Sequence, residues 1–172
     1  MSYRKIFIAL IVFSLFIALF GCSKLALTPS IFEDAEEGVL SLEPDNIVIN
    51  PGKDFEIDLK VASVTELKGY SVFLSYDPDL LSLQGVTEGP FLSSESDTFF
   101  YKSIDNDKGN VLVDCSILGT ALGVSGEGIL ATLSFTSLDS GDTNLSFKLV
   151  KIRDTKNQEI KAAKSNVAIK CR

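Results

Sequence analysis

Apolar and polar residues alternate in short runs along most of this chain, from Val39 to its end. In FEIDLKV, residues 55–61, every odd position is apolar and every even position is charged. Similar runs follow at GYSVFLSY, NVLVDCSIL, GILATLSFTSL and NLSFKLVKI, with turn residues between them. Such alternation puts the two sets of side chains on opposite faces of a β-strand, and no run has the 3.6-residue period of a helix. The pattern therefore predicts an all-β sandwich or barrel.

The N-terminal segment has a different pattern. Two basic residues, Arg4 and Lys5, precede a 15-residue run, 6–20, that is apolar except for one serine. That run is short for a membrane span and has the length of the hydrophobic part of a secretory signal. The run ends in Leu-Phe-Gly-Cys, residues 19–22, which resembles the lipobox of bacterial lipoproteins.

The lipobox resemblance implies cleavage before Cys22 and acylation of its thiol. The rest of the chain would then be an extracytoplasmic lipoprotein anchored to a membrane, at the cell surface or the outer membrane. An ordinary signal peptide with an incidental cysteine, or an uncleaved anchor, remains open. Each of these alternatives also exports the rest of the chain.

Three segments are predicted: a signal peptide (1–21), a flexible acidic tether (22–38) and one folded domain (39–172). The tether has an acidic cluster and no periodic pattern. Cleavage would remove 21 of 172 residues and leave 151, enough for one domain with a sizeable core. The removed part holds two of the 16 basic residues and none of the 23 acidic ones, so the remainder carries 14 against 23, a net charge of −9. This charge repels nucleic acid, which we do not expect as a partner.

Composition excludes several kinds of site. The chain has no histidine, so Ser-His-Asp and Cys-His catalysis and the usual zinc sites are absent. Besides Cys22, the cysteines are Cys115 and Cys171, both on apolar positions of alternating runs. An exported protein permits a disulfide between them, and two separate thiols are the alternative.

Two polar or glycine-rich stretches resemble functional loops but do not match them. DNDKGN, residues 105–110, has Gly109 where an EF-hand calcium loop needs Asp or Asn, so we predict a polar hairpin turn. GTALGVSGEG, residues 119–128, lacks the lysine of a phosphate loop and the second glycine of a hydrolase elbow. We interpret its glycines as structural, and we predict no catalytic residue, metal or cofactor.

Three segments carry a resemblance to the cohesin domain family over about residues 40–170. They are LKGYSVFLSYDPDLLSLQGVTEG with its Tyr-Asp-Pro turn at 76–78, GEGILATLSFTSLDSGDTNLSF, and the polar hairpin RDTKNQEI. Pro78 restricts the backbone where the strand ends, and Asp77 can cap the turn. The resemblance implies a nine-stranded jelly-roll β-sandwich related to carbohydrate-binding modules.

The same resemblance implies a function. Cohesins are non-catalytic and bind dockerins, which are calcium-loaded helical modules of polysaccharide-degrading enzymes. A dockerin-like or other extracellular protein is therefore the expected partner, and a polysaccharide is the alternative ligand. Sugar-binding faces usually stack sugar rings on planar aromatics, and this chain has no tryptophan, which favours a protein partner. A surface enzyme using carboxylates alone is a third reading.

The resemblance also places the binding surface, on the outer face of the sheet around the strand that enters the Tyr-Asp-Pro turn. On that strand the outward set is Ser71, Phe73 and Ser75. The same alternation on other runs extends the predicted partner-binding set to Phe100, Leu112, Asp114, Leu130 and Thr132. Apolar residues ringed by polar ones are typical of an interface, although a β-bulge would reverse the phase of a strand.

Overall fold

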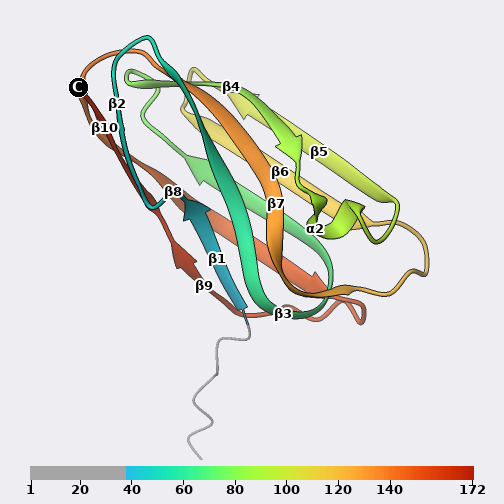
Figure 1. The fold of residues 1–172 in the computed structure, drawn as a ribbon. Coiled ribbons are helices and arrows are strands. Elements are labelled where there is room, and N and C mark those ends of the chain that lie inside the picture. Colours follow the sequence, from blue (N-terminus) through green and yellow to red (C-terminus); the bar gives the residue numbers. More distant parts are fainter. Residues whose placement is uncertain (1–37) are drawn as a thin grey trace, which may run out of the picture. The chain divides into compact units, whose positions relative to one another are not determined.

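The computed structural model describes residues 38–172, a β-sandwich with one short helix (Figure 1). The chain divides into two units, residues 1–34 and 35–172, and every described residue lies in the second. The elements are β1 (Gly38–Glu43), β2 (Asn46–Ile49), β3 (Asp54–Ser75), β4 (Leu81–Glu88), α2 (Pro90–Ser93), β5 (Thr98–Asp105), β6 (Asn110–Ile117), β7 (Val124–Ser137), β8 (Gly141–Asp154), β9 (Ala162–Ser165) and β10 (Val167–Cys171). Within residues 38–172, no helix is long and apolar enough to cross a membrane. The predicted signal peptide with Cys22, and all of the predicted tether except Gly38, lie outside the described residues.

The strands form two layers. Layer 1 has the order β9-β1-β3-β7-β4, in which β1 and β7 flank the first part of β3. Layer 2 has the order β2-β10-β8-β3-β6-β5, in which β8 and β6 flank the last part of β3. Each layer therefore uses a different part of β3.

Strand β3 connects the two layers. Figure 1 shows it running along one layer, bending back at the lower end and returning in the other layer. The bend coincides with register shifts between Val61 and Leu67 and with positive φ angles at Ser63 (57°) and Glu66 (52°). Non-glycine residues adopt such angles at a cost, so surrounding contacts must hold the bend. The amide of Glu66 donates to Ser125 Oγ at 2.8 Å, which supplies one of these contacts.

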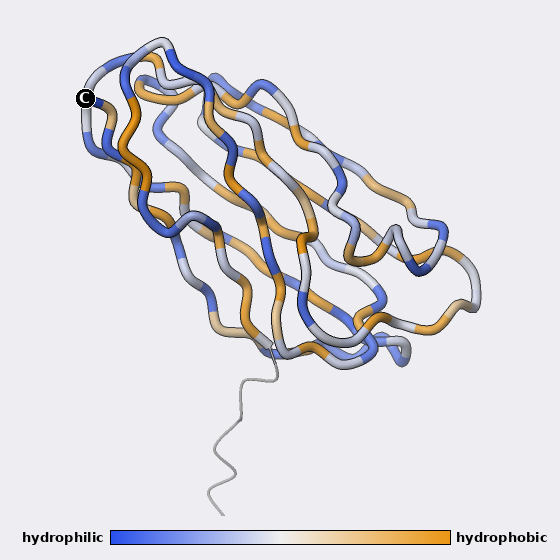
Figure 2. The backbone as a smooth tube through the Cα atoms, viewed as in Figure 1, coloured by the Kyte–Doolittle hydropathy of each residue, from blue (hydrophilic) through white to orange (hydrophobic). Residues whose placement is uncertain are grey.

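The core lies between the layers, where the apolar sets of both parts of β3 point inward. Ile57, Leu59, Val72 and Leu74 are completely buried. Figure 2 shows hydrophobic and hydrophilic positions alternating along the strands, as the sequence predicted. Across the core, the Tyr76 ring meets the Phe135 ring edge-on, with centroids 5.2 Å apart. Burial of alternate apolar side chains is the main force that holds the layers together.

One side chain missed by sequence reasoning also connects the layers. Asn106 lies in the turn between β5 and β6, and its Oδ1 accepts hydrogen bonds from the Tyr76 hydroxyl (2.6 Å) and the Leu83 amide (2.9 Å). Its Nδ2 donates to the Leu83 carbonyl at 3.1 Å. The turn DNDKGN is thus a polar hairpin turn, as predicted, and it also fastens β4 of layer 1 to layer 2.

The all-β sandwich expected from the sequence is confirmed. The resemblance implied nine strands, and the described part is divided into ten, with short interruptions between β1 and β2 and between β9 and β10. The expected cap at the Tyr-Asp-Pro turn is present, since Asp77 Oδ1 accepts the Asp79 amide at 3.0 Å. The glycines of 119–128 are structural. A side chain at Gly123, for example, would lie 2.2 Å from the Glu66 carbonyl oxygen.

Among the described residues, Cys115 and Cys171 are both buried free thiols, so the disulfide considered from the sequence is not formed. Cys115 lies on β6 opposite Tyr70 of β3, whereas Cys171 lies at the end of β10 opposite Gly141 of β8. Alternation placed both residues in the core correctly. It contained no information on whether their strands would bring the two sulfur atoms together.

Candidate docking face

The outer side of layer 2 is built by four adjacent strands, β8, β3, β6 and β5. Antiparallel register aligns their outward side chains in rows that cross the sheet. The three central rows are Leu149–Phe73–Leu112–Ser103, Lys151–Ser71–Asp114–Tyr101 and Arg153–Gly69–Ser116–Phe99. We call the surface formed by these twelve residues the layer-2 face.

Apolar side chains on the layer-2 face remain accessible. Leu149, Phe99 and Tyr101 are 48%, 59% and 47% exposed, and Phe73 and Leu112 between them are partly buried. Eight large apolar residues are exposed in the described part of the chain, and three of them lie on this face. Leu118 and Leu122 are two more, in the loop that follows β6. Exposed apolar residues gathered on one surface, rather than scattered, mark an interaction site.

The structure brings together five of the eight residues predicted for partner binding. Ser71, Phe73 and Ser75 lie on β3, opposite Asp114, Leu112 and Asn110 of β6 respectively. Sequence reasoning found these residues because the alternation on β3 and β6 is unbroken. The remaining three predicted residues lie elsewhere.

Phe100 does not lie on the layer-2 face, so that part of the prediction is wrong. It pairs with the buried Cys115 and packs against the core, while Phe99 and Tyr101 point outward. The run Thr-Phe-Phe-Tyr has an apolar residue in both phases, so the sequence alone could not determine which phenylalanine is buried. Pairing with β6 decides it.

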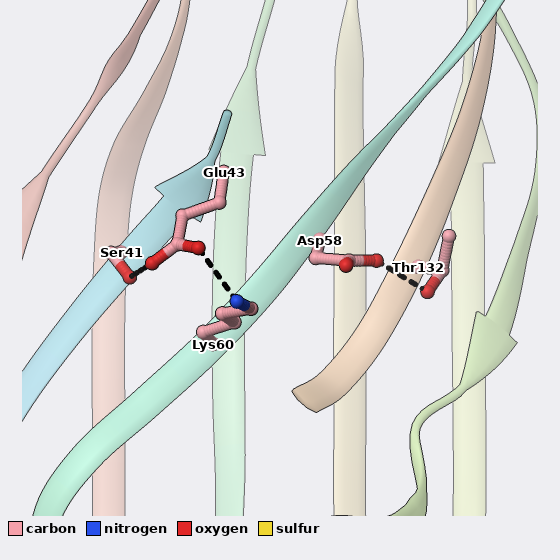
Figure 3. Close-up of polar contacts among 5 residues, drawn as sticks. All are labelled: Ser41, Glu43, Asp58, Lys60 and Thr132. Atoms are coloured by element: carbon pink, nitrogen blue, oxygen red, sulfur yellow. Dashed lines mark hydrogen bonds and ion pairs between the residues drawn. The ribbon is translucent and has the colours of Figure 1, made fainter. Parts of the chain in front are cut away.

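The predictions for Leu130 and Thr132 on β7 are also wrong. Leu130 is only 2% exposed, because a register shift next to Leu59 turns both Leu130 and Ala131 toward the interior. Thr132 lies on the outside of layer 1, where its hydroxyl donates to Asp58 Oδ1 at 2.7 Å (Figure 3). Strand β7 belongs to the other layer, and alternation within one strand cannot reveal that.

Sequence reasoning missed the residues on the two outer strands of this face, β8 and β5. Leu149, Lys151 and Arg153 of β8 alternate with the inward-facing Val150 and Ile152. The alternation in LVKIR, residues 149–153, was a signal for these outward residues. A register shift between Phe147 and Leu149, however, changes which residues of β8 face outward. The same applies to Phe99 and Tyr101, which only the β5–β6 register identifies.

Hydrogen bonds beneath the face hold β5 and β6 against layer 1. Glu88 Oε1 of β4 accepts from the Thr98 hydroxyl at 2.6 Å and from Cys115 Sγ at 3.4 Å. The Lys102 ammonium donates to the Val86 carbonyl, and the Tyr70 hydroxyl donates to the Leu130 carbonyl at 2.8 Å. These bonds hold the strands of the layer-2 face in place against layer 1.

The Cys115 thiol and the Tyr70 hydroxyl beneath the face remain protonated near neutral pH. Burial, together with nearby Glu88, raises the pKa of the Cys115 thiol to about 12. Burial also raises the pKa of the Tyr70 hydroxyl well above its ordinary value. A thiol of this kind is a poor nucleophile, because the thiolate is the reactive form. In the described residues, moreover, no group of three or more Cys, Asp or Glu side chains could hold a metal ion.

One carboxylate on the face lacks a partner. Asp114 Oδ1 is buried and accepts no hydrogen bond from the described residues. In the register of the strands, Asp114 lies between Ser71 of β3 and Tyr101 of β5. Buried carboxylate oxygens usually accept a hydrogen bond, so this atom is an exception among the buried polar atoms of the described residues.

The outer side of layer 1, which we call the layer-1 face, has the opposite character. Three carboxylates of β3 each accept a hydroxyl of β7, in the pairs Asp54–Thr136 (2.6 Å), Glu56–Ser134 (3.3 Å) and Asp58–Thr132 (2.7 Å). Beside them, the Lys60 ammonium lies 2.6 Å from Glu43 Oε2, and the Ser41 hydroxyl donates to Oε1 of the same carboxylate (Figure 3). The hydrogen bond from Lys60 lowers the pKa of Glu43 below its ordinary value.

Comparison with known proteins gives one family. A family model described as the cohesin domain matches residues 41–170. A search of curated proteins finds no match.

Several solved structures share the fold. One is a non-cellulosomal cohesin from the hyperthermophilic archaeon Archaeoglobus fulgidus, 17% identical, with a TM-score of 0.67 over 79% of this chain and 91% of that one. Another is a type II cohesin domain from the cellulosome of Acetivibrio cellulolyticus, 15% identical, with a TM-score of 0.68 over 77% and 94%. A third is a type I cohesin–dockerin complex from Clostridium thermocellum, 14% identical, with a TM-score of 0.67 over 78% and 99%.

Proposed function

Because the chain belongs to the cohesin domain family, we propose that it is a non-catalytic module that binds a dockerin-type protein through its layer-2 face. A structure similar to this chain is that of a cohesin in complex with a dockerin, which supports this choice of partner. The family relationship suggests the class of partner. The choice of surface rests on the side chains of this chain.

The observation that carries the proposal is the contrast in exposed apolar area between the two outer faces. Leu149, Phe99 and Tyr101 are exposed on the layer-2 face, and all three belong to strands next to the central pair β3–β6. On the layer-1 face, hydroxyls and carboxylates of neighbouring strands bind one another. Protein interfaces have an apolar, aromatic-rich centre and a polar rim, and the layer-2 face has this composition.

Carbohydrate binding through the same face is the second candidate function. Phe99 and Tyr101 lie two residues apart on β5, so their rings project from the same side of the strand. Aromatic rings presented in this way can stack on sugar rings. A polysaccharide ligand would need these two rings but not Leu149, which lies three strands away on β8.

The test is titration calorimetry of the protein with a panel of purified dockerin modules and soluble polysaccharides. Leu149→Ala should weaken dockerin binding by roughly tenfold or more, as truncation of an interface residue that contributes strongly to binding does. Leu138→Ala is the matched control, because Leu138 is 49% exposed, nearly the same as Leu149, and lies in the turn after β7. Equal losses for both variants, or binding of a polysaccharide and no dockerin, would refute protein docking.

We further propose that the chain is a lipoprotein, tethered at the cell surface or outer membrane through acylated Cys22. The support is the sequence of residues 19–22 and the apolar run before it. Lipid chains would supply the membrane affinity, so Cys22→Ser should move the protein from the membrane fraction to the soluble or secreted fraction. Unchanged membrane association of that variant would exclude acylation as the anchor.

A further inference from the structure

A hollow opens on the layer-2 face at the row that contains Gly69. Its volume is about 330 Å³. It is lined by Lys68, Gly69, Tyr70, Ser71, Cys115, Ser116, Lys151, Arg153, Asp154, Thr155 and Asn157. A Cβ atom at Gly69 would lie 2.8 Å from the Cys115 carbonyl oxygen, so β3 and β6 approach too closely here for any other residue. The missing side chain leaves space in the middle of a row of larger ones.

Three cationic side chains line this hollow. Lys68 Nζ donates to the carbonyls of Gly119 (3.2 Å) and Ala121 (2.6 Å), and Arg153 Nη1 donates to the Asn157 carbonyl (2.8 Å). These neutral acceptors fix the positions of the head groups and leave their charges uncompensated. Lys151 is exposed and forms no hydrogen bond or ion pair with the described residues.

The acid that lines the hollow does not neutralise all three cations. Asp154 is the only acid in the lining, and its Oδ1 accepts the amides of Lys156 (2.9 Å) and Gln158 (2.7 Å) in the turn after β8. Asp114 lies next to the hollow, on β6 opposite Ser71. The two ion pairs of the described part lie elsewhere, at Lys60–Glu43 and Lys108–Asp105. The hollow is therefore cationic, although the chain as a whole has a net charge of −7.

We propose that this hollow is a subsite for a carboxylate, and that its occupant is an aspartate or glutamate side chain of the docking partner. The inference rests on the proposed docking function and adds the charge of the partner. Arg153 and Lys151 supply charged donors, and the hydroxyl of Ser71, which forms no hydrogen bond with the described residues, supplies a neutral one. Charge-assisted hydrogen bonds of this kind are roughly twice as strong as neutral ones.

The location of the hollow explains why a partner would use it. It adjoins the apolar row Leu149–Phe73–Leu112, with only the row of Lys151 and Ser71 between them. A partner that covers the apolar row therefore brings its neighbouring residues over the hollow. An acidic residue there would compensate the cations, and a basic one would be repelled. The partner is thus expected to have a carboxylate beside its apolar contact residues.

The first experiment needs no partner. Acetate, which has the carboxylate of an aspartate side chain, is titrated into the protein, and the backbone amide signals of Gly69, Ser71 and Ser116 are followed by NMR. We expect saturable shifts at these three amides, weakened by added sodium chloride. Lys151→Gln combined with Arg153→Gln should raise the acetate dissociation constant by roughly tenfold or more, because hydrogen bonds to charged groups are lost.

The matched control is Lys53→Gln combined with Lys164→Gln. It removes the same charge from two exposed lysines outside the layer-2 face, on the turn before β3 and on β9. The control should change the acetate dissociation constant less than twofold. An equal effect in both double variants would show a general charge effect and overturn the subsite. Lys151→Gln alone, at an exposed side chain, replaces the double variant if loss of Arg153 prevents folding.

The second experiment uses any dockerin module that binds the protein. Lys151→Gln should weaken that complex several-fold, and the loss should diminish in high salt because screening weakens the charge pair. A complex that requires Leu149 but is unaffected by Lys151→Gln would overturn the subsite and leave docking intact. Conversely, saturable acetate binding with no dockerin bound would confirm a carboxylate site while refuting the proposed partner. The two proposals therefore fail separately.

Discussion

The two outer faces of the sandwich share strand β3, but they differ in whether their polar side chains are hydrogen-bonded within the layer. β3 contributes Asp58 and Lys60 to the layer-1 face and Ser71 and Phe73 to the layer-2 face. The carboxylate and the ammonium are both held by neighbours in the same layer, Thr132 and Glu43. By contrast, the Ser71 hydroxyl forms no hydrogen bond with the described residues, and Phe73 is only partly buried.

This difference indicates which face already satisfies its polar groups within the chain. On the layer-1 face a partner would have to replace hydrogen bonds that already exist, so binding there would bring little gain in free energy. On the layer-2 face, apolar surface remains in contact with water and Asp114 Oδ1 lacks a donor. Covering that apolar surface would release ordered water, which favours binding of a partner.

The strongest test of the comparison uses two adjacent phenylalanines of β5. Phe100→Ala should lower the free energy of unfolding by about 1–3 kcal/mol, because its ring packs partly against the core. Phe99→Ala should lower it by less than about 0.5 kcal/mol, because its ring is 59% exposed, and should instead weaken docking. Urea unfolding and calorimetric titration measure the two effects. Should Phe99→Ala prove the more destabilising change, the β5–β6 register and the face built on it would be wrong.

A second test replaces one hydroxyl-bearing residue on each face by valine. Thr132→Val removes the hydrogen bond to Asp58 and should lower the free energy of unfolding by about 0.5–1.5 kcal/mol without affecting docking. Ser71→Val should leave stability unchanged or slightly raised, since no hydrogen bond is lost and valine favours strands. Its effect should appear in docking instead. Both variants are compared by thermal unfolding, and the reverse ranking would contradict the contrast between the faces.

The smallest expected effect is a pH dependence of stability at the layer-1 face. Hydrogen bonding to Lys60 lowers the pKa of Glu43 below 4.5, its ordinary value. The pair therefore stabilises the fold above that pH, and the stabilisation disappears as pH falls through the lowered pKa. Exposure and salt screening keep the effect small. Glu43→Gln should remove this part of the acid loss, which develops as pH falls below the ordinary value of 4.5. An identical pH profile in low salt would show that the pair does not contribute.

The prediction of outward-facing residues from sequence was most accurate where two strands alternate without interruption. On β3 and β6 the apolar positions Val72, Leu74, Val111 and Val113 are buried, so Phe73 and its neighbours must point outward. On β5, alternation defined two faces without showing which is inside, so Phe100 was assigned to the wrong side. On β7, the register shift beside Leu59 turns Leu130 inward, which alternation could not predict.

Period-two alternation by itself determined that this protein is an all-β sandwich or barrel, and the positions of turn residues determined roughly where its strands end. Those properties depend on neighbours along the chain, because successive side chains of a strand point to opposite sides. Contacts between distant segments decided the rest. The bend at Ser63 and Glu66 lets one strand serve both layers, and the register shift beside Leu130 turns two consecutive residues inward. The hollow at Gly69 exists only because β8 brings Lys151 and Arg153 beside it. Such features depend on pairing and packing between segments far apart in sequence, so only the tertiary structure reveals them.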